Sequence, residues 1–106
     1  MIIIDITGLT TITIDEDYQH LDTLYLSSSN STESIDGIDG LPLGKEVMFF
    51  ALGNLSIDFN GVSVNAGNIH LDTSTITING LKKDFIKFFV NESDNQIYLD
   101  EYINYL

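Results

Sequence analysis

The chain has 106 residues without cysteine or tryptophan, and its four lysines stand against sixteen acidic residues, which gives a formal net charge of −12 at pH 7. With so few cations the chain lacks the means to neutralise phosphates, so direct binding of DNA or RNA is excluded. The absence of cysteine also excludes disulfides and thiolate metal sites. A hydrophobic fraction of 43% at this length predicts one folded domain, residues 1–106. Beside so large a charge, this apolar content predicts that some apolar surface is buried between subunits.

The first third of the chain predicts short strands. Residues 2–7 and 11–14 are rich in isoleucine and threonine and alternate between apolar and polar side chains, and 23–26 continues this pattern. The apolar start is broken at Asp5, long before the length of a signal core or a membrane span, so we expect neither export nor membrane contact. The polar stretch 27–34 predicts a surface loop.

The central segment, residues 40–61, organises the rest of the chain. A Gly-Leu-Pro turn opens it, an apolar run follows, and alternation over 55–59 leads to Asn60-Gly61, which predicts a tight hairpin continued at Val62 and Val64. Forty residues on, 80–90 repeats the first part of this segment. The two apolar runs are therefore expected to form the centre of the fold.

The last third predicts four more strands. Residues 69–72 and 75–79 alternate, 85–90 is apolar almost throughout, as in a strand covered on both faces, and 96–99 ends the series. The tyrosines and aliphatic residues of 100–106 are expected to be buried across a subunit boundary.

This series of nine or ten strands, without a helical period of normal length, predicts the fold class. We expect an all-β protein, a small sandwich, jelly-roll or barrel-like module of short antiparallel strands that assembles as a trimer.

The search for chemistry gives no catalytic motif. There is no Gly-x-Ser-x-Gly elbow and no phosphate-binding glycine loop, so we expect no enzyme. A zinc site would need both His20 and His70 with distant carboxylates, and the ordinary interpretation is two surface histidines, with His70 paired to Asp72. The acidic turns 15–17 and 36–40 lack the ligand ladder of a calcium loop, and solvated turn acids are the default interpretation. We expect no cofactor and no metal.

Aromatic residues are the remaining candidates for a functional surface. Such residues form cores, ligand pockets or subunit contacts, and we predict an assembly interface. Its predicted members are Phe49, Phe50, Phe88, Phe89, Tyr98, Tyr102 and Tyr105. Replacing Phe49 or Phe88 by aspartate is therefore predicted to abolish assembly.

One ordered set of motifs resembles β-modules that recur in bacteriophage virion proteins. It consists of Gly40-Leu41-Pro42-Leu43-Gly44-Lys45-Glu46-Val47, the strand from Leu55 to Phe59, and Gly67-Asn68-Ile69-His70-Leu71. The resemblance covers about residues 35–99, and Asp22-Thr23-Leu24-Tyr25-Leu26 also fits it. Similar modules occur in tail fibres, head fibres and proteins that decorate capsids. This chain departs from them in having no tryptophan in its last strand and no shaft, which favours a decoration protein or a small head fibre.

The resemblance implies a structural, commonly trimeric protein of the virion. Such a protein would be made in the host cytoplasm, bind itself, the capsid lattice or other virion proteins through apolar strand surface, and present an acidic outer face. Two alternatives stay open. One is a carbohydrate-binding or receptor-binding module at a fibre tip, which would take a glycan at Tyr98 or Tyr102. The other is an acidic inhibitor that imitates nucleic acid.

Overall fold

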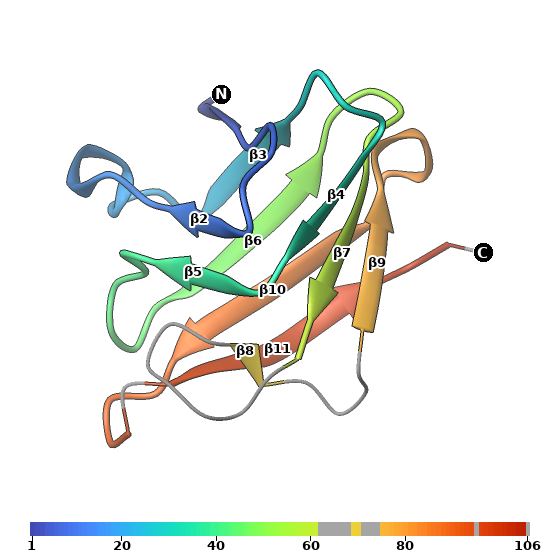
Figure 1. Ribbon diagram of the computed structural model, residues 1–106. Coiled ribbons are helices and arrows are strands. Elements are labelled where there is room, and N and C mark those ends of the chain that lie inside the picture. Colours follow the sequence, from blue (N-terminus) through green and yellow to red (C-terminus); the bar gives the residue numbers. More distant parts are fainter. Residues whose placement is uncertain (62–68, 71–74, 95, 106) are drawn as a thin grey trace.

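The computed structural model describes residues 1–61, 69–70, 75–94 and 96–105, with only the backbone of 69–70 (Figure 1). This part of the chain is mainly β and contains no α-helix. Its strands are β1 (Ile3–Asp5), β2 (Thr11–Thr13), β3 (Thr23–Ser27), β4 (Thr32–Ile35), β5 (Gly37–Asp39), β6 (Glu46–Ala51), β7 (Ser56–Asn60), β8 (Ile69–His70), β9 (Thr75–Asn79), β10 (Phe85–Val90) and β11 (Ile97–Ile103). Two single 3₁₀ turns are η1 (Glu16–Tyr18) and η2 (Gly80–Lys82).

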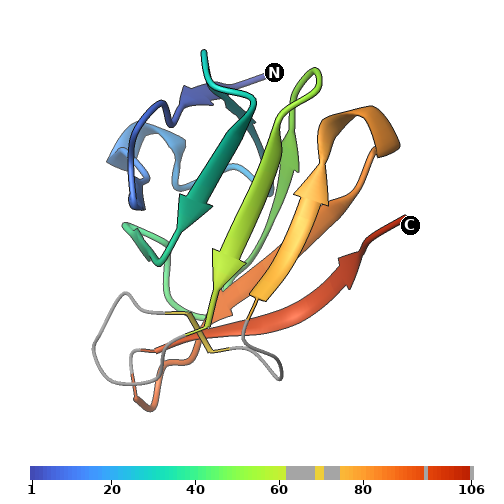
Figure 2. The ribbon, with the colours of Figure 1, turned by 45° about the vertical axis from the view of Figure 1, so that its right-hand side comes forward.

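The described strands form three sheets in two layers. Sheet A has the order β1-β3-β6-β10-β11-β8, sheet B pairs β2 with β5, and sheet C has the order β4-β7-β9. Figures 1 and 2 show sheets B and C over the same face of sheet A, and no other described strand lies over the opposite face, which we call the uncovered face. Sheet A begins at β1 and ends at β8 without closing on itself, so the barrel-like alternative is wrong.

The first sixty residues wind as a β-helix does, with parallel strand pairs, whereas the sequence predicted antiparallel strands. In sheet A, β1, β3 and β6 are parallel neighbours, and β2 with β5 and β4 with β7 are parallel pairs in the other two sheets. Residue pairs such as Ile3 with Tyr25 and Thr11 with Gly37 set one turn of the winding at 22 to 26 residues.

Antiparallel pairing enters only in the second half of the chain. There β9 lies antiparallel to β7, and β10 lies antiparallel to both β6 and β11. The sheets are therefore mixed: the prediction of antiparallel strands holds for these three pairings, whereas β8 lies parallel to β11. The two similar apolar runs, which the sequence singled out, are the neighbours β6 and β10.

The core lies between the two layers and is built from alternate residues of each strand. Phe49 and Phe88 point inward from sheet A, and Phe59 points toward them from sheet C; all three are completely buried. The ring centroid of Phe88 lies 6.1 Å from that of Phe49 and 5.5 Å from that of Phe59, distances at which tilted rings attract one another. These three rings join the layers at the centre of the molecule.

Two local expectations need correction, the loop at 27–34 and the length of the last strand. The polar stretch 27–34 is only partly a loop, because its last residues belong to β4, which pairs with β7. The antiparallel partner of β7 is β9, which Asn60 meets at Thr75. The predicted hairpin strand at Val62 and Val64, and the predicted pair of His70 with Asp72, lie outside the described residues. The last strand is longer than predicted and runs to Ile103.

A buried carboxylate ties the C-terminal segment to the second layer. Asp84 is 1% exposed, and its Oδ2 accepts a hydrogen bond of 3.0 Å from the backbone N–H of Asn79 while its Oδ1 accepts one of 2.8 Å from that of Tyr105. The side-chain amide of Asn104 donates to the carbonyl oxygen of Thr77 in β9 at 2.6 Å. The end of the chain is thus fastened to sheet C, although β11 belongs to sheet A.

Candidate assembly surface

The uncovered face of sheet A is the largest functional candidate that the fold creates. Along β10, Ile86, Phe88 and Val90 point into the core, whereas Phe85, Lys87 and Phe89 point outward and are half-buried. The expectation that this strand is covered on both faces is therefore wrong for the single chain. The outward face of β10 carries two phenylalanines without a covering layer among the described residues, and apolar surface of this kind is unusual on a soluble protein.

Strand register aligns five apolar side chains across this face. Ile3 of β1 lies beside Tyr25 of β3, Tyr25 beside Phe50 of β6, Phe50 beside Phe85 of β10, and Phe85 beside Ile103 of β11. We call these five residues the aromatic row. Its rings are in contact, since Tyr25 and Phe50 stack at 5.5 Å and Phe50 and Phe85 meet tilted at 5.9 Å. Its two ends are the most exposed, with Ile3 at 52% and Ile103 at 36%.

A small hollow of about 270 Å³ lies at one side of the aromatic row. Tyr25 and Phe50 line it together with Gly53, Gly80 and Lys83. A Cβ on Gly80 would lie 2.5 Å from the carbonyl oxygen of Gly53, so only glycine lets these two turns approach so closely. The hollow is mostly apolar, with one ammonium group at its edge.

A charged row runs beside the aromatic row. The Nζ atom of Lys87 lies 3.9 Å from a carboxylate oxygen of Glu46 and 3.3 Å from one of Glu101. Lys45 makes a second ion pair of 3.3 Å with Asp22 and donates a hydrogen bond of 3.2 Å to the carbonyl oxygen of Gln19. These ion pairs neutralise both lysines within the chain.

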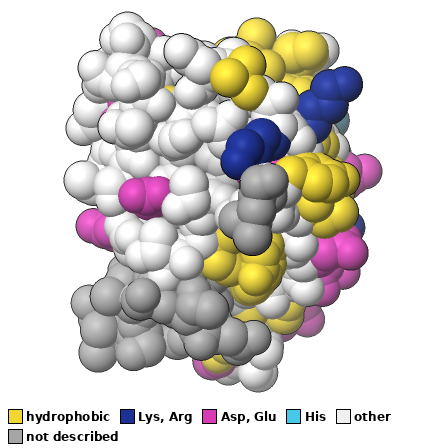
Figure 3. Space-filling model, turned by 90° about the vertical axis from the view of Figure 1, so that its right-hand side faces the viewer, with side chains coloured by type: hydrophobic (Ala, Val, Ile, Leu, Met, Phe, Trp, Pro, Cys, Tyr) yellow, Lys and Arg dark blue, Asp and Glu magenta, His cyan; other side chains and the backbone are white. Residues whose placement is uncertain are grey.

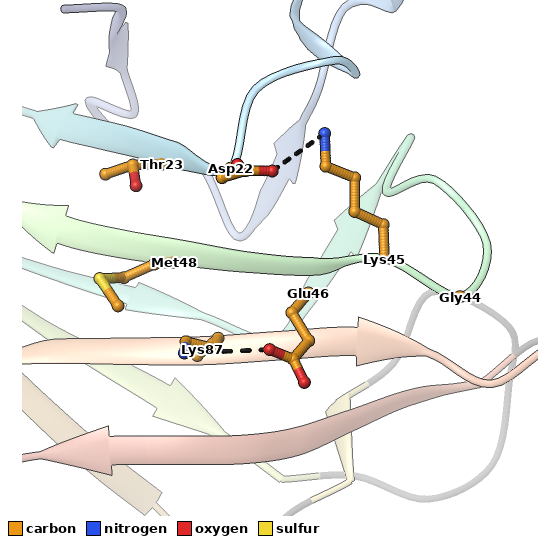
Figure 4. A pocket seen from close by; sticks show the side chains of 7 residues that line it. All are labelled: Asp22, Thr23, Gly44, Lys45, Glu46, Met48 and Lys87. Carbon is orange, nitrogen blue, oxygen red and sulfur yellow. Dashed lines mark ion pairs between the residues drawn. The ribbon is translucent and has the colours of Figure 1, made fainter.

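A second, more polar hollow of about 630 Å³ lies between these ion pairs. Figure 4 shows the lysine and acidic side chains around it, with Thr23 and Met48 between them. Carboxylates, ammonium groups and a hydroxyl offer hydrogen-bond donors and acceptors in one place. The arrangement can bind a polar ligand, but it holds no nucleophile paired with a base.

A further aromatic pair follows on the same face. Phe89 stacks on Tyr98 with ring centroids 5.9 Å apart. The Tyr98 hydroxyl donates a hydrogen bond of 2.5 Å to Asp94, and this bond to a carboxylate raises the pKa of Tyr98 above its usual value. The tyrosine therefore stays protonated and its ring orientation is fixed.

The structure divides the seven predicted interface residues into three groups. Phe49 and Phe88 are completely buried within the single chain, so they have no surface to offer to another chain. Phe50, Phe89 and Tyr98 point outward from sheet A. Tyr102 and Tyr105 are exposed at the C-terminal end, away from that face.

Four members of the aromatic row were not predicted from the sequence, namely Ile3, Tyr25, Phe85 and Ile103. Alternation within each strand separates the two faces, and that signal was present at Phe85 and Tyr25. The missing information was the register between strands, because it alone shows that these residues form one continuous row.

The predicted metal and membrane features can be located only in part. His20 is exposed, and the side chain of His70 is not described. In the described ranges there is no group of three histidine or acidic residues able to hold a metal ion. Within the same ranges, no helix has the length and apolar character needed to cross a membrane.

Comparisons with known proteins add no relationship. No family model, no curated protein and no solved structure matches this chain. Its function is therefore argued from its own surface.

Proposed function

We propose that this chain is a non-enzymatic structural protein of a phage virion, of the capsid decoration or head-fibre type. The virion assignment depends on the resemblance of residues 35–99 to virion β-modules. The assembly role is supported independently by one observation, the aromatic row on the uncovered face of sheet A.

The aromatic row is apolar surface in contact with water, which is unfavourable in free energy. Soluble monomers rarely leave a continuous apolar stripe across five strands, and such surface is stabilised by burial at about 25 cal/mol per Å². The rigid rings of Tyr25, Phe50 and Phe85 lose little side-chain entropy when they are covered, and aromatic residues are enriched in interface cores. The ion pairs of Lys45 and Lys87 beside them provide a polar rim.

The native mass of the purified chain tests this proposal. A mass near three times 11.8 kDa by light scattering is expected, and Phe50→Ser should lower it to that of a monomer because it places a polar group at the centre of the aromatic row. Leu43→Ser, at an exposed apolar position outside the row, serves as the control and should leave the mass unchanged. A wild-type chain that stays monomeric at all concentrations would contradict self-assembly.

The position on a virion needs a separate test. Particles purified from the cells that make this chain would be labelled with an antibody raised against it and viewed by electron microscopy. We expect label on the particle surface. Unlabelled particles would refute the virion assignment and leave self-assembly standing.

A second candidate is a carbohydrate-binding module, favoured by the polar hollow of Figure 4. A neutral sugar needs paired donors and acceptors, which Lys87 and Glu46 supply, and an apolar surface for its C–H groups, which the neighbouring rings supply. Binding on a glycan array that is lost in Lys87→Met and kept in the control His20→Ala would support this function. An array without any bound glycan would remove it.

A further inference from the structure

A second exposed surface lies on the side of the molecule where β9 and the C-terminal segment meet. Leu81 in η2 is 74% exposed, and Tyr102 and Tyr105 are 44% and 54% exposed. Lys82 and Lys83 follow Leu81 directly and are exposed as well. We call these five residues the basic flank. Figure 3 shows hydrophobic and lysine side chains next to each other on this side.

The basic flank holds the cations that are free to meet another molecule. Lys45 and Lys87 are ion-paired inside the chain, whereas no carboxylate of the described residues lies within 4.0 Å of the ammonium groups of Lys82 and Lys83. The chain has four lysines, no arginine and a net charge of −12. Lys82 and Lys83 are therefore the lysines best placed for an attractive charge contact between two copies.

These two lysines are presented on a turn with a fixed shape. The Asn79 side chain accepts a hydrogen bond of 2.9 Å from the backbone N–H of Leu81, and Lys83 has a positive φ of 58° that ends η2. Gly80 is pressed against the turn at Gly53, and Asp84 is buried directly behind the lysines. A fixed turn loses little backbone entropy on binding, which favours a contact at this position.

The complementary surface of a second copy is the turn Asp15–Asp17. Its three acidic side chains are exposed, take part in no ion pair among the described residues and follow one another directly in the chain. Within this turn, the Asp15 carboxylate accepts a hydrogen bond of 2.9 Å from the backbone N–H of Asp17. Of the other described acids, several are engaged within the chain: Asp22, Glu46 and Glu101 in ion pairs, and Asp5, Glu33, Asp36, Asp58, Asp84 and Asp94 in hydrogen bonds. Figures 1 and 2 show this turn, between β2 and β3, at the opposite end of the molecule from β9 and the C-terminus.

We propose that the basic flank of one chain binds the turn Asp15–Asp17 of the next copy. This inference rests on the proposed self-assembly and identifies which surfaces meet. Two different surfaces make a heterologous contact, which closes into a ring such as a trimer or continues as a filament. The apolar side chains of Leu81, Tyr102 and Tyr105 supply buried area, and the lysines select the acidic end of the neighbour and repel wrong orientations. Lys83 also lines the hollow beside Phe50, so the flank is continuous with the aromatic row.

Charge reversal with rescue tests the contact. The double variant Lys82→Glu, Lys83→Glu and the double variant Asp15→Lys, Asp17→Lys should each weaken self-association about 100-fold, since like charges then face each other. The variant carrying all four changes restores opposite charges and should regain the wild-type mass by light scattering. The control Glu92→Lys, Asp100→Lys makes the same charge change at exposed acids that belong to neither surface and should assemble normally. Circular dichroism confirms that each variant is folded.

The outcomes separate this inference from the proposed function. Double variants that keep the wild-type mass, or a folded four-fold variant that stays monomeric, would overturn the flank contact even if Phe50→Ser still abolishes assembly. A monomeric wild type would refute both proposals.

Discussion

Replacing Phe88 by alanine tests whether its ring joins the two layers. Phe88 belongs to sheet A, is completely buried and touches Phe59 of sheet C. Loss of a buried phenylalanine costs about 3–5 kcal/mol, since the apolar contacts disappear and a cavity remains. A domain of this size has a total stability of about 5–15 kcal/mol, so a large share of it depends on one side chain. Phe50→Ala is the matched control, because that ring is half-buried on the open face and its loss should cost about 1 kcal/mol.

Urea unfolding followed by circular dichroism measures both variants. With a slope of about 1–2 kcal/mol per M, Phe88→Ala should lower the midpoint by about 2–4 M, and Phe50→Ala by less than about 1 M. The two should differ in the opposite sense in assembly, where Phe50 matters and Phe88 does not. If both variants lose the same small amount of stability, the ring of Phe88 does not lie between the layers, and the arrangement of sheets A and C is incorrect.

Two further predictions concern polar contacts. Asp84→Ala leaves the part-buried backbone N–H groups of Asn79 and Tyr105 without their acceptor and should cost about 2–4 kcal/mol, with faster hydrogen exchange at the amide of Tyr105; the exposed Asp100→Ala should change neither. A hydrogen bond from the hydroxyl of Ser28 is the main reason that the pKa of Glu33 lies below its ordinary value of 4.5. The ionised carboxylate therefore stabilises the fold above pH 4.5, and this stabilisation is lost as the pH falls below that value. Glu33→Gln should therefore be less stable at pH 7 and lose less stability below pH 4.5, and an unchanged pH profile would exclude this role.

Local alternation was enough to place many of the strands, although not β4 and β5, which lie in stretches predicted as a loop and a turn. The segments around β3, β9 and β10 follow the sequence prediction closely, because half-buried strands must alternate and the isoleucines and phenylalanines fit no helical period. The order of the strands was a different matter. A strand alternates in the same way whether its neighbour is parallel or antiparallel, so the winding of β1, β3 and β6 leaves no mark on local pattern. The turns of the winding also share no repeated residues that could have revealed a period.

The same limit explains which site residues were found. Aromatic pairs such as Phe49-Phe50 attracted attention as pairs, but adjacent residues in a strand point to opposite faces, so one ring enters the core and the other the surface. The interface prediction therefore needed to be divided between the two faces. The basic flank could not be predicted from the sequence, because whether Lys82 and Lys83 form ion pairs depends on where the fold places the carboxylates.

The uneven distribution of charge on this chain would give the proposed assembly a direction. With a net charge of −12, two copies repel one another at most relative orientations. The aromatic row alone would stabilise a contact between copies but would not select their relative orientation, because hydrophobic burial is non-directional. In the proposed contact, Lys82 and Lys83, which pair with no carboxylate of the described residues, meet the acidic turn of the next copy. Opposite charges would then favour one head-to-tail arrangement, and like charges would disfavour the others. In the proposed assembly, a chain without Lys82 and Lys83 would keep the aromatic row but would lose the charge contact that orients neighbouring copies.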